Sequence, residues 1–166
     1  MAGPSSDRRV VPGLIDRLLD DEPETSSEPA WREGQVVREL KKSLRRDLED
    51  LLNARRPLDA LPDGFDHLPG SLANYGLPDL QSVEIRETHD LQRLCRLIED
   101  SIRRFEPRLQ NVSVSPLVEH GDQRPLDRRL RFEIHALLVA DPLREPVQLT
   151  SAVDAGSGAI LVEAAG

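Results

Sequence analysis

The sequence predicts an α+β fold in which N-terminal helices pack on a C-terminal antiparallel β-meander of three to four strands. Two observations carry this prediction. Apolar residues recur every three or four positions in the first two thirds of the chain, and then at every second position. The connections between the alternating segments are too short for the helical crossovers that parallel strands require. Helices followed by a meander indicate that the helices cover one face of the sheet.

The clearest helical pattern runs from residue 36 to residue 55, and no proline or glycine interrupts it before Pro57. Its apolar stripe consists of Val37, Leu40, Leu44, Leu48, Leu51 and Leu52. Its other side carries a basic stripe of Arg38, Lys41, Lys42 and Arg45. This basic stripe either meets an anionic partner or is a solvated helix face, and the residues leave both interpretations open.

A second amphipathic helix is expected from Thr88, its N-cap, to Phe105. The helix ends there because Pro107 disfavours helical geometry at the preceding residue. Its apolar stripe consists of Leu91, Leu94, Cys95, Ile98, Ile102 and Phe105, so Cys95 is expected to be a buried apolar side chain. Residues 57–87 hold four prolines and three glycines, which predicts turns and at most one short helical piece.

Four segments of alternating hydrophobicity are expected to be strands. The longest alternation is formed by Leu130, Phe132, Ile134, Ala136 and Leu138. Shorter alternations lie at residues 112–114, 147–153 and 160–162, the last after a turn at residues 154–158.

Residues 1–34 are expected to form a flexible N-terminal extension, and residues 35–166 the folded domain. The extension holds four prolines and an acidic, serine-rich stretch, which together provide too little apolar surface to fold alone. Within it, Leu14 and Leu18 lie on one side of a short amphipathic helix. Such a helix is unstable alone in water, so Leu14 and Leu18 are expected to dock, either on the domain or on a partner.

Composition excludes several classes of function. The chain carries 22 Lys and Arg against 30 Asp and Glu, a formal net charge of −8, which argues against nucleic-acid binding by the whole surface. One cysteine cannot form an internal disulfide, and no apolar run approaches the length of a membrane span. We therefore expect a cytoplasmic protein. The scattered histidines support no metal site, no phosphate-binding loop occurs, and no cofactor or catalytic residue is predicted.

Four stretches resemble one known family when they are taken together. They are LIDRLLDDEP at 14–23, DLEDLLNARR at 47–56, SLANYGLPD at 71–79 and FEPRL at 105–109. Their combination is similar to the TssE family of type VI secretion baseplate subunits, which belongs to the phage baseplate wedge family and carries a historical lysozyme-like label. The hallmark of that family is a Glu-Pro-Arg triplet, which here is Glu106, Pro107 and Arg108.

The resemblance implies a non-enzymatic, cytoplasmic part of a baseplate docked at the inner membrane. The implied partners are the wedge proteins TssF and TssG, the baseplate protein TssK, and the sheath proteins TssB and TssC. The resemblance further implies that this chain seeds the contractile sheath, whose strands would add to an uncapped edge of the meander.

Two interpretations of the triplet stay open at this stage. Glu106 and Arg108 either bond to a partner or form an internal ion pair where the helix stops. Two rival functions also stay open. The first is a peptidoglycan-cleaving hydrolase that uses two carboxylates, and the second is a soluble adaptor unrelated to secretion.

Overall fold

The computed structural model describes residues 13, 15, 18, 33–56, 64–79, 88–117, 130–153 and 158–164. Its helices are α2 (Glu33–Asn53), the short 3-10 turns η1 (Leu68–Gly70) and η2 (Leu72–Asn74), and α3 (Thr88–Phe105). Its strands are β1 (Leu109–Leu117), β2 (Leu130–Ala140), β3 (Leu143–Val153) and β4 (Ile160–Ala164). The predicted turn at 154–158 lies outside the described residues except for Gly158.

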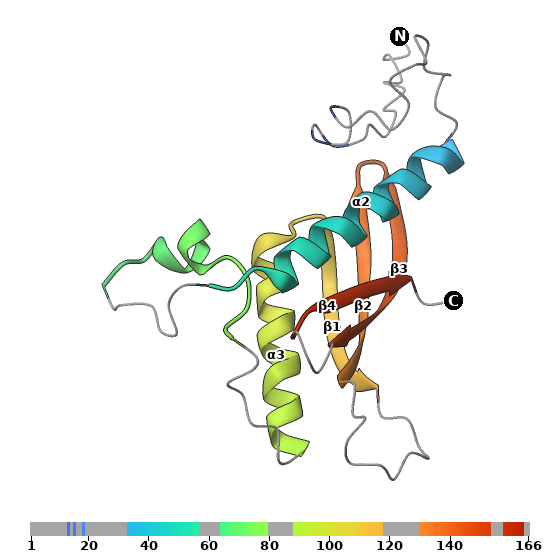
Figure 1. The fold of residues 1–166 in the computed structure, drawn as a ribbon. Helices are drawn as coiled ribbons and strands as arrows, with labels where there is room; N and C mark the ends of the chain where they lie inside the picture. The colour runs from blue at the N-terminus through green and yellow to red at the C-terminus, as the bar shows by residue number, and fades with distance from the viewer. Residues whose placement is uncertain are drawn as a thin grey trace.

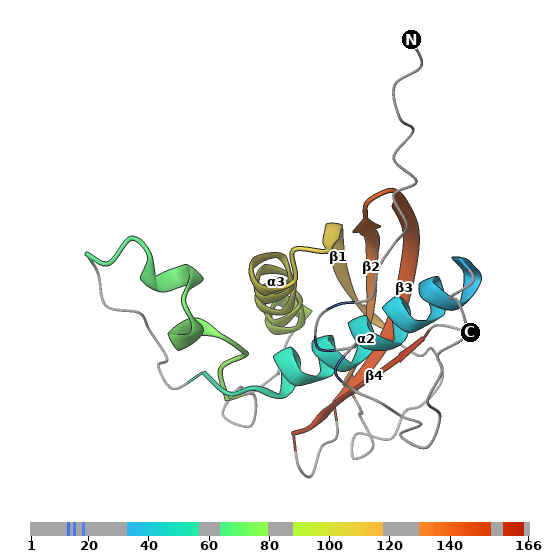
Figure 2. The same cartoon turned by 90° about the horizontal axis from the view of Figure 1, so that it is seen from above.

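The predicted α+β arrangement is confirmed. The four strands form one antiparallel sheet in the order β1-β2-β3-β4, so each strand pairs with its neighbour in sequence. Helices α2 and α3 lie over the same face of this sheet, as Figures 1 and 2 show, with α3 against β1 and α2 against β4. The two outer strands are therefore the ones that the helices contact most closely.

The two helices supply the core on their side. Leu44 and Leu48 of α2 and Ile98 of α3 are at most 1% exposed, and Cys95 is buried as expected. The apolar stripe of α2 begins at Val36, which is buried, whereas Val37 is only half buried. Val36 lies on the same face of the helix as the buried Leu40, Leu44 and Leu48, because these residues follow it in steps of four.

The sheet supplies the other half of the core through alternate residues. Phe132, Ile134 and Leu138 of β2 are at most 1% exposed and lie beneath the helices. Strands β2 and β3 have 11 residues each, whereas β4 has five and pairs only with residues 149–153 of β3.

The division of the chain at residue 34 falls in the first turn of α2 and stays a prediction.

A parallel bridge joins the end of α2 to residues 76–79. The Leu77 amide donates to the Ala54 carbonyl at 2.9 Å, and the Arg56 amide donates to the Leu77 carbonyl at 3.0 Å. Gly76 makes this approach possible, because at its φ of 95° a Cβ would lie 2.0 Å from the Ala54 oxygen. The preceding residues 64–75 project away from the sheet (Figure 1).

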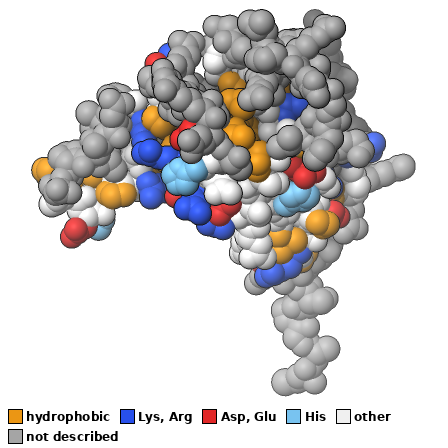
Figure 3. Space-filling model, turned by 90° about the horizontal axis from the view of Figure 1, so that it is seen from below, with side chains coloured by type: hydrophobic (Ala, Val, Ile, Leu, Met, Phe, Trp, Pro, Cys, Tyr) orange, Lys and Arg blue, Asp and Glu red, His pale blue; other side chains and the backbone are white. Residues whose placement is uncertain are grey.

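The described surface mixes side chains of different kinds. Seen from below, hydrophobic and charged side chains are interspersed (Figure 3). Within the described ranges, no helix is long and apolar enough to cross a membrane.

Candidate functional site

The Glu106-Pro107-Arg108 triplet forms the turn between α3 and β1. The Glu106 amide donates to the Ile102 carbonyl at 2.9 Å, which completes the last turn of the helix. Pro107 is exposed at the corner. The Arg108 carbonyl accepts from the Val139 amide at 2.8 Å, so the chain enters the sheet directly after the triplet.

The two charged side chains of the triplet bond to each other. Glu106 is 5% exposed, and its carboxylate accepts from Arg108 Nε at 2.7 Å and from Arg108 Nη2 at 2.5 Å. A buried carboxylate needs such charge-assisted donors, because desolvation of an unpaired charge is costly. The hydrogen bond from Arg108 to Glu106 is also the main reason why the pKa of the Arg108 guanidinium lies above its usual range.

Helix α2 extends this ion-pair network across the domain. Arg108 Nη2 also lies 2.6 Å from Asp47 Oδ2, and Arg46 Nη2 lies 2.9 Å from Asp47 Oδ1. Ser43 Oγ lies 3.4 Å from Asp47 Oδ2. The network therefore ties the end of α3 to the middle of α2. The network has the geometry of an internal ion pair, which is one of the two interpretations that the sequence left open, and Pro107 beside it is exposed.

The aromatic pair Tyr75 and Phe105 lies beside this network. The two rings meet edge to face with centroids 5.2 Å apart. Burial raises the pKa of the Tyr75 hydroxyl, and the negative charges of Asp50, Asp47 and Glu106 raise it further.

The remaining predicted contact residues lie in the N-terminal segment. Leu14 lies outside the described residues. Leu18 is helical and 74% exposed, and Ile15 is helical and 64% exposed. The structure does not bring Leu18 together with the Glu106 network.

Side chains of α2 cover the outer edge of β4. Asn53 Nδ2 donates to the Ile160 carbonyl at 2.8 Å, and Asn53 Oδ1 accepts from the Ile160 amide at 2.8 Å. One turn earlier in the helix, Glu49 Oε1 accepts from the Val162 amide at 3.0 Å. We call Glu49 and Asn53 the β4 clamp.

Side chains of α3 cover the outer edge of β1 in the same way. Arg103 Nη2 donates to the Val112 carbonyl at 2.8 Å, and Glu99 Oε2 accepts from the Val114 amide at 3.2 Å. Glu99 and Arg103 also form an ion pair of 2.6 Å. We call them the β1 clamp. Pro116, two residues further along β1, has no amide hydrogen to offer on that edge.

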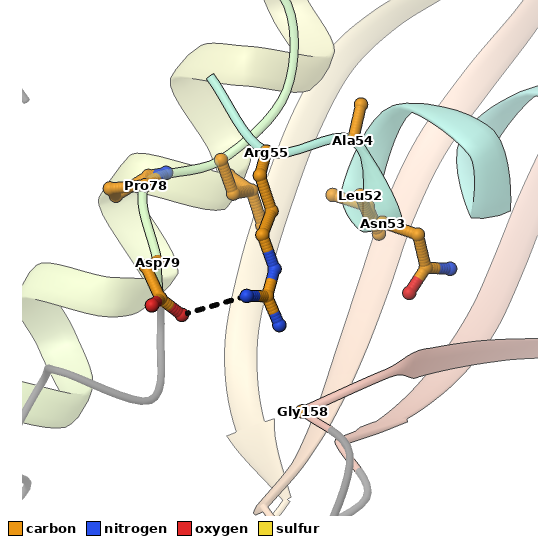
Figure 4. Close-up of a pocket in the computed structure, with 8 residues that line it drawn as sticks. Leu52, Asn53, Ala54, Arg55, Pro78, Asp79 and Gly158 are labelled. Carbon is orange, nitrogen blue, oxygen red and sulfur yellow. Dashed lines mark ion pairs between the residues drawn. The ribbon is translucent and has the colours of Figure 1, made fainter. Parts of the chain in front are cut away.

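The depression at the end of α2 is too small for a substrate. Its volume is about 20 Å³, enough for a single water molecule. Arg55 and Asp79 meet in it at 3.6 Å, as Figure 4 shows. Among the described residues, no group of three or more His, Cys, Asp or Glu is arranged to hold a metal ion.

These features define an α+β protein whose ordered polar groups hold strand edges and a helix end in place. Residues 38–143 match the family described as baseplate wedge protein gp25. The match spans more than half of the chain, from α2 to the start of β3, and the chain belongs to this family. The resemblance inferred from the sequence is thereby confirmed.

Among solved structures, the chain is similar to one from "The baseplate complex from the type VI secretion system", with 20% identity and a TM-score of 0.46. That similarity covers 70% of this chain and 96% of the other. No curated protein matches the chain.

Sequence reasoning identified the triplet but missed its partner Asp47 and both clamps. Asp47, Glu49 and Asn53 all belong to a stretch that the sequence had singled out, residues 47–56. The available signal was a pair of polar residues four positions apart on the flank of each apolar helix stripe. Such pairs also occur on solvated helices, so only the packing of helix against strand distinguishes them.

Proposed function

We propose that this chain is a structural baseplate subunit of a type VI secretion system, in the TssE branch of the wedge family. In this role it joins the wedge proteins TssF and TssG, contacts TssK, and seeds polymerisation of the TssB–TssC sheath by adding sheath strands to its sheet. The observation that carries the proposal is the family match over residues 38–143. The proposed location is the cytoplasmic side of the inner membrane.

The triplet is the proposed contact with the wedge proteins. The ion pairs of Glu106, Arg108 and Asp47 hold the corner between α3 and β1 rigid, and Pro107 is exposed at that corner. A preorganised corner loses little conformational freedom when it binds. In this proposal the two interpretations of the triplet are compatible, since the internal ion pair shapes the surface that the partner contacts.

Capture of a purified TssF–TssG complex tests the triplet. Pro107→Ala leaves the ion pairs in place and should weaken capture several-fold, while Glu106→Ala/Arg108→Ala should weaken it about ten-fold or more. Arg93→Ala/Arg96→Ala is the matched control, because it removes two exposed side chains of α3 and leaves the triplet and its ion pairs unchanged. Its capture should stay within about two-fold of wild type. Unchanged capture by both triplet variants, with helix content preserved in circular dichroism, would contradict this contact.

The N-terminal helix is proposed as a second contact. Ile15 and Leu18 are exposed apolar side chains, which suits docking into a groove of a partner. Proteolysis at residues 14–19 should be rapid in the isolated chain and slow after TssF–TssG is added. Cleavage at the same rate in both samples would count against docking.

The proposal excludes peptidoglycan cleavage, which needs two carboxylates flanking a sugar chain. In the described part of the chain, the groove between α2 and β3, about 410 Å³, is lined by basic, apolar and amide side chains and by no carboxylate. A turnover assay on purified cell wall should show no cleavage above the buffer rate. Measurable turnover would contradict the structural role and favour the hypothesis of a peptidoglycan-cleaving hydrolase.

A further inference from the structure

Strand β3 is longer than the strand beside it. Strand β4 pairs with residues 149–153 and ends at Ala164, whereas β3 begins at Leu143. On that side of the sheet, no described strand pairs with residues 143–148. The other side of the same residues is fully paired with β2.

The alternation of an antiparallel ladder shows which backbone groups face this gap. Ile160 and Val162 direct their amides to α2, so Leu161 and Glu163 are the residues of β4 that bond to β3. Their register partners are Ala152 and Thr150. Continuing along β3 in steps of two, the residues that face the gap are Gln148, Pro146 and Arg144.

Pro146 fits this assignment. A proline is tolerated in a long inner strand only where its missing amide hydrogen faces away from the paired neighbour. In the gap, Gln148 and Arg144 offer both an amide and a carbonyl, and Pro146 offers a carbonyl alone. The gap therefore presents more acceptors than donors.

Among the described residues, side chains bond to the outer edges of β1 and β4, whereas none bonds to the backbone of this gap. The β1 clamp occupies the Val112 carbonyl and the Val114 amide, and the β4 clamp occupies Ile160 and the Val162 amide. A strand that added to either edge would first have to displace these side chains. A strand that added to residues 144–148 would displace none of them.

A basic groove lies over the gap. It has a volume of about 410 Å³ and lies between α2 and residues 146–149 of β3, with Ala164 at the end of β4 closing one side. Figure 2 shows that α2 and β4 run side by side. Leu44, Val147 and Leu149 contribute its apolar lining. Lys41, Lys42 and Arg45 contribute three exposed positive charges. Lys41 already pairs with Glu145 of β3 at 3.5 Å, and Lys42 pairs with Glu39 of its own helix at 3.9 Å.

We propose that this groove receives an extended acidic segment of a partner protein, which pairs with residues 144–148 of β3 in line with β4. The inference rests on the proposed function and specifies the site and the chemistry of the added strand. The strand supplies amides to the three carbonyls of the gap. On the side that faces α2 it carries carboxylates, which pair with Lys41, Lys42 and Arg45.

The probe is a fluorescent eight-residue peptide that alternates glutamate and threonine, with both ends blocked. The full-length chain should bind it, and a lysine-threonine peptide should not bind. Lys41→Glu/Lys42→Glu/Arg45→Glu should weaken binding about ten-fold or more, since three favourable charge pairs become repulsive. The matched control is Arg93→Glu/Arg96→Glu/Arg104→Glu, an equal change of charge at exposed residues of α3, which should bind as wild type does.

Backbone methylation of the peptide distinguishes strand pairing from charge attraction alone. N-methyl groups on the glutamates block one edge of the peptide, and N-methyl groups on the threonines block the other. Methylation of one of these two sets of amides should abolish binding, and methylation of the other set should leave binding unchanged. Equal binding by both methylated peptides would overturn the proposal in favour of charge attraction.

Two further readouts separate this inference from the proposed function. The inference is supported if the groove variant Lys41→Glu/Lys42→Glu/Arg45→Glu still captures TssF–TssG but no longer binds the peptide. The inference alone is overturned if the wild-type chain captures TssF–TssG but does not bind the peptide. A chain that captures no baseplate protein overturns the proposed function. Sedimentation that shows a wild-type dimer, lost in the groove variant, would assign the groove to a second copy and overturn the partner strand.

Discussion

The outer edges of β1 and β4 are both covered by two side chains of a helix with the same spacing, but the two pairs differ in the charge of their donor residue. In the β4 clamp and in the β1 clamp, a glutamate accepts from a strand amide, and the residue four positions later donates to the carbonyl two residues before that amide. Asn53 of the β4 clamp is a neutral amide that bonds to both the amide and the carbonyl of Ile160. Arg103 of the β1 clamp is 53% exposed, bonds to a carbonyl only, and is ion-paired with Glu99.

The two clamps are expected to respond differently to salt. A side-chain amide offers one donor and one acceptor, as a strand residue does, so Asn53 replaces a neighbouring strand at Ile160. The exposed ion pair of the β1 clamp is screened by salt, whereas the neutral amide bonds are not. We therefore expect the β1 edge to open more readily than the β4 edge as ionic strength rises.

The largest expected effect lies outside both clamps, in the network that fixes the two helices relative to each other. Arg108→Ala removes both guanidinium donors from the buried Glu106 carboxylate and leaves it only the main-chain amide of residue 108, at 3.2 Å, so the change should cost about 3–5 kcal/mol of unfolding free energy in urea denaturation. The double variant Glu106→Gln/Arg108→Met removes both charges and should recover a large part of that loss. Equal stability of wild type and Arg108→Ala would show that the ion pair contributes nothing.

The next largest effect is expected in the β4 clamp. Asn53→Ala removes both bonds to Ile160 and should cost about 1–3 kcal/mol, because each lost bond contributes roughly 1 kcal/mol. The loss should be the same at low and at high salt. Asn53→Asp keeps the acceptor and loses the donor, so its stability should lie between those of Asn53→Ala and wild type. A strong salt dependence of the Asn53→Ala difference would contradict the comparison.

A smaller effect is expected in the β1 clamp. Arg103→Ala should cost about 1 kcal/mol at low salt, since its ion pair and its bond to Val112 are partly exposed. The difference from wild type should shrink in high salt, as measured by urea denaturation in both buffers. If it grew with salt, the ionic account of this clamp would be wrong.

The smallest effect is a titration that leaves the fold intact. Tyr75 is the only tyrosine of the chain, so tyrosinate absorbance reports on it alone. Its midpoint should lie above 10.0, because burial and the charges of Asp50, Asp47 and Glu106 raise the pKa. Because the pKa of Tyr75 is higher in the folded chain than in the unfolded chain, the protonated hydroxyl contributes to stability. This contribution is complete below the pKa of the unfolded chain and is lost as the pH rises through the pKa of the folded chain. Asp50→Asn should lower the midpoint, and an unchanged midpoint would remove the proposed charge effect.

The sequence predicted most of the fold because its signals are local. Periods of 3.6 and 2 identify helices and strands from neighbouring residues, and α3 ends at Phe105, as Pro107 indicated. The helix includes Thr88 as its first residue, whereas the sequence placed Thr88 as the N-cap before it. The apolar stripe of α2 was placed one residue late at its first position, since Val36 and Val37 are both apolar and only packing separates them.

The candidate site was less predictable because its contacts join distant residues. Glu106 and Arg108 are neighbours in sequence and were identified, but Asp47 lies 61 residues before Arg108. Asn53 and Ile160 are separated by 107 residues. Such contacts depend on the register of a helix against a strand, which no local pattern specifies.

Residue-resolved amide hydrogen exchange in the isolated full-length chain tests the central claim, that the clamps cover both outer strands and leave part of β3 available. The amides of Ile160, Val162 and Val114 should exchange slowly, because side chains of α2 and α3 accept from them. The amides of Arg144 and Gln148, which face the gap, should exchange fast. Slow exchange at Arg144 and Gln148, or fast exchange at the three clamped amides, would contradict the account.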